Sequence, residues 1–149
     1  MNALKSLSRA LMTFAMIAGL MLGASLFTPS ASAAGYARIT LHVFECGAKG
    51  GNLYDQCHNG KHALSDAAFR VAGVTRYTDA NGHVTWGPGA GTRSIAGYNL
   101  SWGYYDSYVY CSNQVTGAVL YDGLSGGDDY IVITTTAGQP VVCDWYYLF

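Results

Sequence analysis

The chain has 149 residues, a formal net charge of −1 and 11% charged side chains. This length fits one domain around a single modest core rather than two domains. Because Lys and Arg form no cluster after residue 33, nucleic acids and anionic membrane surfaces are poor candidates for its partners.

The first 33 residues have the pattern of a secretory signal peptide. A positive segment with Lys5 and Arg9 precedes an apolar run over residues 11–22, and an A-x-A cleavage motif ends at Ala33. The apolar run is shorter than the ~20 residues that a membrane-spanning helix needs. We expect cleavage before Ala34, a single domain over residues 34–149 and no membrane insertion after cleavage. Residues 1–33 hold two of the eight basic residues and none of the nine acidic ones, so the domain has six against nine and a formal charge of −3.

All four cysteines lie after residue 33, and an even number in an oxidising compartment indicates two disulfides. Three pairings are formally possible. We favour Cys46–Cys57, which closes a Gly-rich loop, and Cys111–Cys143, which joins a late strand to the last one. On the chain-entropy model the two bonds contribute about 3 and about 3.7 kcal/mol to the free energy of unfolding, a large share of the about 5–15 kcal/mol of a typical domain.

Alternation of apolar and polar residues predicts strands along the domain, and no segment after Ala34 has apolar residues at helical spacing for three turns. The first strands are expected at residues 38–43 and 69–71. Residues 77–86 are expected to form a hairpin around Asn81-Gly82, because both residues tolerate the positive φ angles of tight turns. The segments 47–62 and 87–91 are expected to be loops.

Five further strands are expected at residues 94–102, 108–112, 118–121, 130–136 and 141–148. About seven or eight short strands in about a hundred residues are typical of a sandwich with Greek-key connections. The sequence therefore predicts an all-β fold, a seven- to eight-stranded Greek-key β-sandwich with two disulfides.

Four segments occur in a suggestive order: ITLHVF at 39–44, ALSDAAFRV at 63–71, TDANGHVTW at 78–86 and VVCDWYY at 141–147. They resemble a first strand, a "pL-x-GA-x-F-x-V" segment, a "TD-x-x-G-x-V-x-F" segment and the closing strand of the prealbumin-like fold family. This family contains the Cna B-type repeats of collagen-binding adhesins and pilin-type surface domains. The resemblance spans nearly all of the domain and implies a prealbumin-like, immunoglobulin-like sandwich that serves as an extracellular structural or adhesive module.

The same resemblance raises the question of an intramolecular isopeptide bond. In this family the bond needs a Lys on the first strand, an Asn on the last strand and a buried carboxyl group. Here the first strand has no Lys, Tyr147 stands about where the Asn would be, and residues 97–105 contain no Glu. We therefore expect no isopeptide bond, with the two disulfides as the covalent braces.

Two patterns could indicate chemistry, and each has a simpler explanation. Residues 123–127 match G-x-S-x-G around Ser125, but no helix pattern follows, as it would in an α/β-hydrolase. His58 and His62 beside Cys57 suggest a zinc site, but a disulfide removes the thiolate ligand. We expect no catalytic residue, no metal and no other cofactor.

Aromatic residues are the strongest sign of a binding surface. Twelve tyrosines are more than a core of this size can hide, and Tyr and Trp rings suit protein interfaces and stacking on sugar rings. Roughly half of them should fill the core. The candidate binding patch comprises Trp102, Tyr104, Tyr105 and Tyr108.

These features together predict an exported, non-enzymatic binding or surface-structural module of the adhesin or pilin kind. Its partner would be a protein or a glycan at the cell surface or outside the cell. The alternative is a small secreted carbohydrate-binding protein that uses the aromatic residues of segment 102–110. A minor hydrolase acting through Ser125 is the third hypothesis.

The secreted protein should begin at Ala34 and contain the disulfides Cys46–Cys57 and Cys111–Cys143. N-terminal sequencing and peptide mapping under non-reducing conditions would measure both. A peptide joining Cys46 to Cys111, or an additional mass loss equal to one ammonia, would contradict the expected covalent structure.

Overall fold

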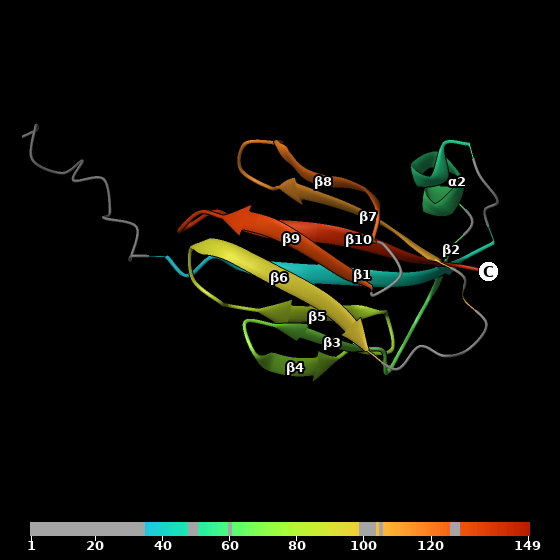
Figure 1. Ribbon diagram of the computed structural model, residues 1–149, viewed down its shortest axis with the longest axis horizontal. Helices are drawn as coiled ribbons and strands as arrows, with labels where there is room; N and C mark the ends of the chain where they lie inside the picture. The colour runs from blue at the N-terminus through green and yellow to red at the C-terminus, as the bar shows by residue number, and fades with distance from the viewer. Residues whose placement is uncertain (1–34, 48–50, 60, 99–103, 105, 126–128) are drawn as a thin grey trace, which may run out of the picture. The chain divides into compact units, whose positions relative to one another are not determined.

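The computed structural model describes residues 35–47, 51–59, 61–98, 104, 106–125 and 129–149 (Figure 1). These residues form ten strands, in two sheets, and one short helix. The six-stranded sheet has the order β2 (Lys61–Ala63), β1 (Ile39–Cys46), β10 (Val141–Leu148), β7 (Asp106–Asn113) and β8 (Val119–Leu124), with β5 (His83–Trp86) also paired to β1. The four-stranded sheet has the order β4 (Val74–Tyr77), β3 (Ala68–Val71), β6 (Gly91–Tyr98) and β9 (Tyr130–Thr135).

Strand β1 lies inside the six-stranded sheet. It pairs in parallel with β10 along its whole length, from Ile39 opposite Val141 to Cys46 opposite Leu148. Its other edge takes two short antiparallel strands, β5 opposite its first half and β2 opposite its end. The first and last strands of the domain are therefore direct neighbours.

The two sheets face each other across one hydrophobic core. In β1 the buried residues Ile39, Leu41 and Val43 alternate with half-buried Thr40 and His42, the pattern of a strand with one face in a core. They belong to one cluster with residues of the opposite sheet, including Phe69, Val71, Ile95, Ile131 and Ile133. The mostly β, sandwich-like architecture predicted from the alternation is confirmed.

Helix α2 (Leu53–Asn59) covers one end of the outer face of the six-stranded sheet (Figure 1). Asn52 caps it: the Asn52 side-chain oxygen accepts a hydrogen bond from the Asp55 backbone N–H at 3.2 Å, and the Asn52 amide donates to the Asp55 carboxylate at 2.6 Å. Beneath the helix is a second hydrophobic cluster, formed by Phe44, Cys46, Cys57, Tyr108, Tyr146 and Leu148. The end of β10 is consequently buried on both faces.

The prediction of a loop over residues 47–62 is wrong, because this segment contains α2 and the start of β2. The fold is thus mostly β rather than all-β, because it includes this one short helix. A helix of seven residues makes two turns, which is too short to show helical periodicity over three turns. The Asn-x-x-Asp capping pattern was the available signal.

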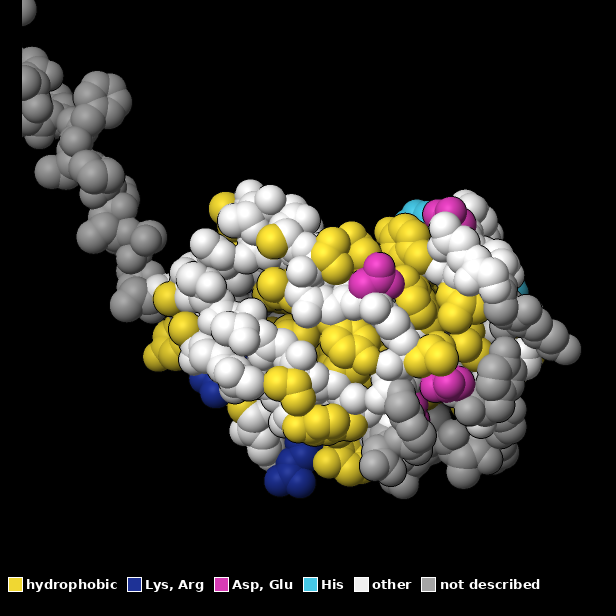
Figure 2. Space-filling model, turned by 45° about the horizontal axis from the view of Figure 1, so that its top comes forward, with side chains coloured by type: hydrophobic (Ala, Val, Ile, Leu, Met, Phe, Trp, Pro, Cys, Tyr) yellow, Lys and Arg dark blue, Asp and Glu magenta, His cyan; other side chains and the backbone are white. Residues whose placement is uncertain are grey.

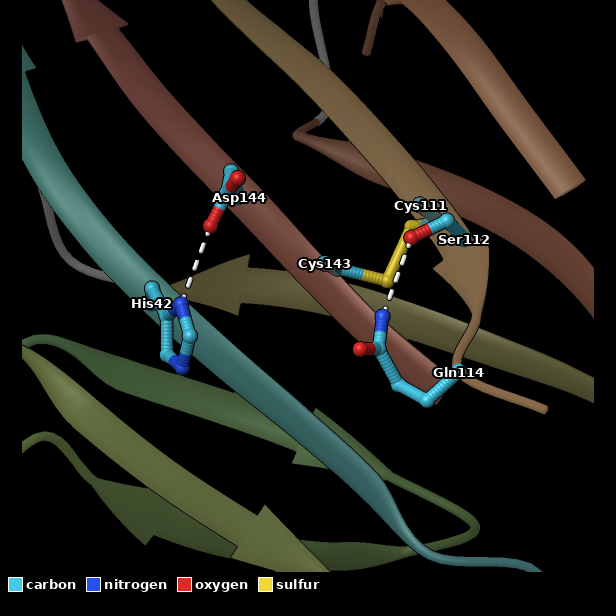
Figure 3. The surroundings of a disulfide bond; sticks show 6 residues. All are labelled: His42, Cys111, Ser112, Gln114, Cys143 and Asp144. Carbon is cyan, nitrogen blue, oxygen red and sulfur yellow. Dashed lines mark hydrogen bonds and ion pairs between the residues drawn. A yellow bond between two sulfur atoms is a disulfide. The ribbon is translucent and has the colours of Figure 1, made fainter. Parts of the chain in front are cut away.

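Both predicted disulfides are confirmed. Cys46–Cys57 joins the end of β1 to α2. Cys111 and Cys143 are directly opposite each other in the antiparallel pair β7–β10, and their bond crosses between these strands (Figure 3). Two disulfides are typical of proteins in an oxidising compartment. Among the described residues, no helix has the length and apolar character needed to cross a bilayer.

The predicted hairpin over residues 77–86 is wrong, because its two strands belong to different sheets. Strand β4 pairs with β3 in the four-stranded sheet, whereas β5 pairs with β1 in the six-stranded sheet. The tight turn between them exists: the Gly82 N–H donates to the Asp79 carbonyl at 2.9 Å. Only Gly82 has a positive φ there, whereas the two-residue turn favoured by Asn-Gly needs positive φ at both positions.

Contacts on both sides of this turn explain why the chain changes sheet. The buried Thr78 hydroxyl donates to the Leu64 carbonyl at 2.6 Å and accepts from the Ala67 N–H at 3.0 Å. The Gly82 carbonyl then accepts from the Val43 N–H of β1 at 2.8 Å. The segment between the sheets is thus held at both ends by hydrogen bonds.

The predicted number of seven to eight strands is too low, since the described residues form ten, and the short strand β2 begins in the segment that was predicted as a loop. Strand β10 has the predicted bounds, and β6, β7, β8 and β9 lie near theirs. Predicted strand residues 99–102 lie outside the described residues.

Gly82→Ala should reduce the free energy of unfolding by about 3 kcal/mol, through positive-φ strain and a steric clash. A Cβ at Gly82, where φ is +76°, would lie 2.3 Å from the Val43 carbonyl oxygen. Gly73→Ala is the matched control, because Gly73 has a φ of +83° with open space around its Cβ position. It should lose only about 1 kcal/mol. Equal losses in denaturant unfolding would show that the Val43 contact does not matter.

Candidate functional site

A row of five titratable side chains crosses the outer face of the six-stranded sheet. The strand registers place His83, His42, Asp144, Tyr110 and Asp122 directly opposite one another on β5, β1, β10, β7 and β8, in that order. All five are exposed or half-buried, while their neighbours along each strand alternate toward the core. We call this set the polar row.

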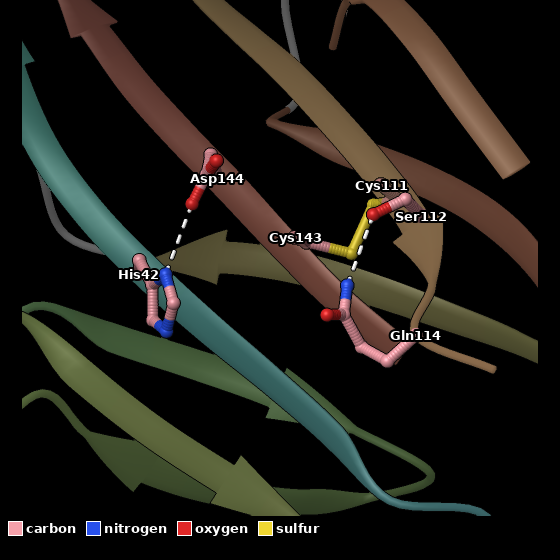
Figure 4. A network of polar contacts seen from close by, with 6 residues as sticks. All are labelled: His42, Cys111, Ser112, Gln114, Cys143 and Asp144. Atoms are coloured by element: carbon pink, nitrogen blue, oxygen red, sulfur yellow. Dashed lines mark hydrogen bonds and ion pairs between the residues drawn. A yellow bond between two sulfur atoms is a disulfide. The ribbon is translucent and has the colours of Figure 1, made fainter. Parts of the chain in front are cut away.

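One half of the polar row is a histidine pair next to a carboxylate. The His42 Nδ1 atom lies 3.0 Å from the Asp144 carboxylate, and both side chains extend toward each other from adjacent strands (Figure 4). The His83 ring lies against the His42 ring, with 4.4 Å between their centroids. Asp144 can therefore orient the His42 imidazole.

The other half of the polar row ends in a hollow beside α2. Its volume is about 420 Å³, and it is lined by Gly51, Asn52, Leu53, Tyr54, Tyr108, Tyr110 and Asp122. The Tyr54 and Tyr110 rings, which are part of its lining, contact each other with 4.7 Å between their centroids. We call this feature the tyrosine hollow. On the face in Figure 2, hydrophobic side chains and carboxylates lie together near α2.

Hydrogen bonding and burial order the walls of the tyrosine hollow. The Tyr108 hydroxyl donates to the Asp122 carboxylate at 2.5 Å, and the Tyr108 ring stacks on Tyr146. Burial, followed by this hydrogen bond, raises the pKa of Tyr108 above its usual range. Burial and the charge of Asp144 also raise the pKa of Tyr54. Both phenols are therefore neutral at physiological pH; the single O–H of Tyr108 is engaged with Asp122, so of these two the Tyr54 hydroxyl is the one that can donate to a ligand.

The tyrosine hollow can bind a ligand that has both an apolar face and hydroxyl groups. The Tyr54 and Tyr110 rings offer flat surfaces for stacking. Asp122 is exposed, so a carboxylate oxygen can accept hydrogen bonds from a ligand while Tyr108 holds the group in place. Small-molecule sites of this size typically combine aromatic walls with a small number of polar groups.

The structure divides the predicted binding patch. Tyr108 is buried, with 8% of its surface exposed, and it lines the tyrosine hollow. Tyr104 is half-buried; its ring packs 5.2 Å from that of Tyr147, and its hydroxyl donates to Glu45. Trp102 and Tyr105 lie outside the described residues, and their role in binding stays a prediction.

Other tyrosines form the exposed aromatic surface that the composition indicated. The outer face of the four-stranded sheet carries Tyr77, Tyr98 and Tyr130, which are 65%, 42% and 47% exposed. Tyr77 and Tyr98 lie on either side of Ala68 in one cross-strand row. These tyrosines lie on the other sheet from the tyrosine hollow.

Ser125 lies in a hydroxyl and carboxylate cluster rather than beside a histidine. Its Oγ is 2.5 Å from the Ser107 Oγ and donates to the Asp129 carboxylate at 3.3 Å, and Ser107 also donates to Asp129 at 2.8 Å. Both serines are buried. This arrangement lacks the histidine that activates the serine of a nucleophile elbow.

The histidines near the first disulfide serve other contacts. Cys46 and Cys57 are bonded to each other, and the His58 ring stacks on Tyr54 with 5.5 Å between centroids. His62 is exposed on β2. Within the described part of the chain, no group of three His, Cys, Asp or Glu side chains is arranged to hold a metal ion.

Sequence reasoning did not identify Tyr54 or Asp122 as binding residues. Tyr54 belongs to the helix that was predicted as a loop, so no pattern placed it over β7. Asp122 could be assigned only through its register with Tyr110 in the β7–β8 pair. The local Asn52-x-x-Asp55 pattern could have indicated α2 and, with the Cys46–Cys57 bond, its position.

No protein-family model matches the chain, and no curated protein or solved structure is significantly similar to it. Its function must therefore be inferred from its own residues.

The stability of the domain should fall as the pH rises from 10 to about 12. Burial, with the hydrogen bond to Glu45, raises the pKa of Tyr104 from 10.0 to about 12. In this interval the unfolded chain loses a proton that the folded chain keeps, so the stabilisation is complete below pH 10 and is lost as the pH passes the folded pKa. Denaturant midpoints measured across this range should decline less steeply in Tyr104→Phe. Tyr36→Phe, at an exposed ring, should leave the slope unchanged, and an unaltered slope in Tyr104→Phe would contradict the assignment.

Proposed function

We propose that this domain is an exported, non-catalytic carbohydrate-binding module whose site is the tyrosine hollow. The observation that carries the proposal is the convergence of three tyrosines, Tyr54, Tyr108 and Tyr110, with the Asp122 carboxylate in one hollow. The signal-peptide pattern of residues 1–33 and the two disulfides support export.

A glycan fits this hollow better than a charged or purely apolar ligand. A sugar ring has an apolar C–H face that can lie on a tyrosine and hydroxyl groups that can bond to a carboxylate. Tyr110 is half-buried between Asp144 and Asp122, so a ligand stacked on it can reach either carboxylate. Carboxylates on both sides of Tyr110 would repel an anionic ligand at this position.

A surface-structural role of the adhesin or pilin kind is a second candidate. It is supported by the exposed Tyr77, Tyr98 and Tyr130, which form a face suited to contact with another protein. The adjacency of β1 and β10 also agrees with the prealbumin-like resemblance, in which an isopeptide bond would link the first and last strands. Glu45, rather than a lysine, is opposite Tyr147 in this pair.

Tyr110→Ser should weaken binding of a neutral oligosaccharide by about tenfold or more, since it removes one stacking wall. A glycan array would first identify the oligosaccharide, and isothermal titration would then measure its dissociation constant. Tyr130→Ser is the matched control, because it removes an exposed tyrosine from the opposite sheet. Both variants should retain their free energies of unfolding within about 1 kcal/mol, as measured by denaturant unfolding.

Two results would contradict the proposal. One is an unchanged dissociation constant for Tyr110→Ser with the fold intact. The other is loss of binding in Tyr130→Ser alone, which would move the site to the outer face of the four-stranded sheet. Cleavage of the bound glycan would contradict a purely binding role.

A further inference from the structure

A second hollow lies at the free edge of β5 and differs from the first in charge. Its volume is about 430 Å³, and it is lined by Tyr36, Arg38, Arg76, Thr85, Trp86 and Gly87. Arg38 comes directly before β1, whereas Arg76 belongs to β4 of the other sheet. Two guanidinium groups from different sheets therefore border one concavity, which we call the arginine hollow.

The positive charge of the arginine hollow is not neutralised by neighbouring side chains. Within the described residues, the single ion pair is His42–Asp144, so no carboxylate pairs with Arg38 or Arg76. This is unusual in a domain with a formal charge of −3, where acidic side chains outnumber basic ones. In Figure 2 the Lys and Arg side chains lie at the lower left of the face, away from the Asp and Glu side chains.

One guanidinium is held in position by the backbone. The Arg76 Nη1 atom donates to the Thr85 carbonyl at 2.6 Å, on the edge of β5 that is not paired with β1. A guanidinium has five N–H donors, so this bond orients Arg76 and leaves other donors for a ligand. Arg38 is exposed beside it, so its side chain can turn toward the same ligand.

Aromatic rings border the two guanidiniums. Tyr36 is 80% exposed, a large exposure for a tyrosine next to a strand. Trp86 is 4% exposed, and its indole N–H already donates to the Val74 carbonyl at 3.0 Å, so the indole contributes a fixed wall rather than a hydrogen-bond donor. The combination offers fork-shaped donors for a planar or tetrahedral oxyanion and a ring for an adjoining apolar surface.

We propose that the arginine hollow binds the oxyanion group, carboxylate or sulfate, of an acidic polysaccharide. Arg38 and Arg76 bond to the oxyanion, and Tyr36 stacks on the sugar ring that carries it. This site is separate from the tyrosine hollow and does not depend on it, because the two share no lining residue. A neutral sugar lacks the group that two guanidiniums recognise.

The test measures binding of polygalacturonate, dextran sulfate and neutral dextran to the secreted domain at several salt concentrations. We expect binding to one or both acidic polymers, none to neutral dextran, and affinity that falls with salt. Arg38→Gln and Arg76→Gln should each weaken this binding by about tenfold. Both variants should fold, because the side chains of Arg38 and Arg76 are both exposed.

Arg70→Gln is the matched control, because Arg70 is an exposed residue of β3 that does not line the hollow. It makes the same change in charge and should retain full binding. Tyr110→Ser should also retain it, which separates this site from the tyrosine hollow. Equal weakening in Arg70→Gln, absence of binding to both acidic polymers, or equally tight binding of poly-glutamate would overturn the proposal.

Discussion

The parallel pairing of β1 with β10 is the interaction around which the rest of the domain is arranged. Its inward residues, such as Val43 opposite Trp145, form the middle of the sandwich core, while His42 opposite Asp144 belongs to the polar row. Both disulfides are attached to this pair, through Cys46 to α2 and through Cys143 to β7. Because β1 and β10 are the first and last strands of the domain, the chain between them must leave this pair and return to it.

The binding surface arises because α2 covers only part of the outer face of this pair. Phe44 and Tyr146 are buried beneath the helix, whereas the next row, which includes His42 and Asp144, is half-exposed. The tyrosine hollow lies at the boundary between covered and open surface. A helix of seven residues is not stable alone, so the Asn52 cap, the Cys46–Cys57 bond and the cluster beneath it must hold Tyr54 in place.

The domain separates its charges in a way that its net charge does not reveal. Asp122 and Asp144 flank Tyr110 on the outer face, whereas Arg38 and Arg76 border the free edge of β5. A single small domain can thus offer one site for neutral polyhydroxylated ligands and another for oxyanions.

Features that depend on neighbouring residues or on simple counts could be predicted from the amino-acid sequence alone. Alternation located β1 and β10, the cysteine count and spacing indicated both disulfides, and Gly82 marked a turn. The pairing of strands could not be predicted in this way, since the hydrogen-bonding partners of β4 and β5 lie in different sheets despite the turn between them. The burial of Tyr108 could not be predicted either. Alternation shows that residues share a face of a strand, but burial depends on what covers that face, and α2 is positioned over Tyr108 by contacts between segments that are distant in sequence.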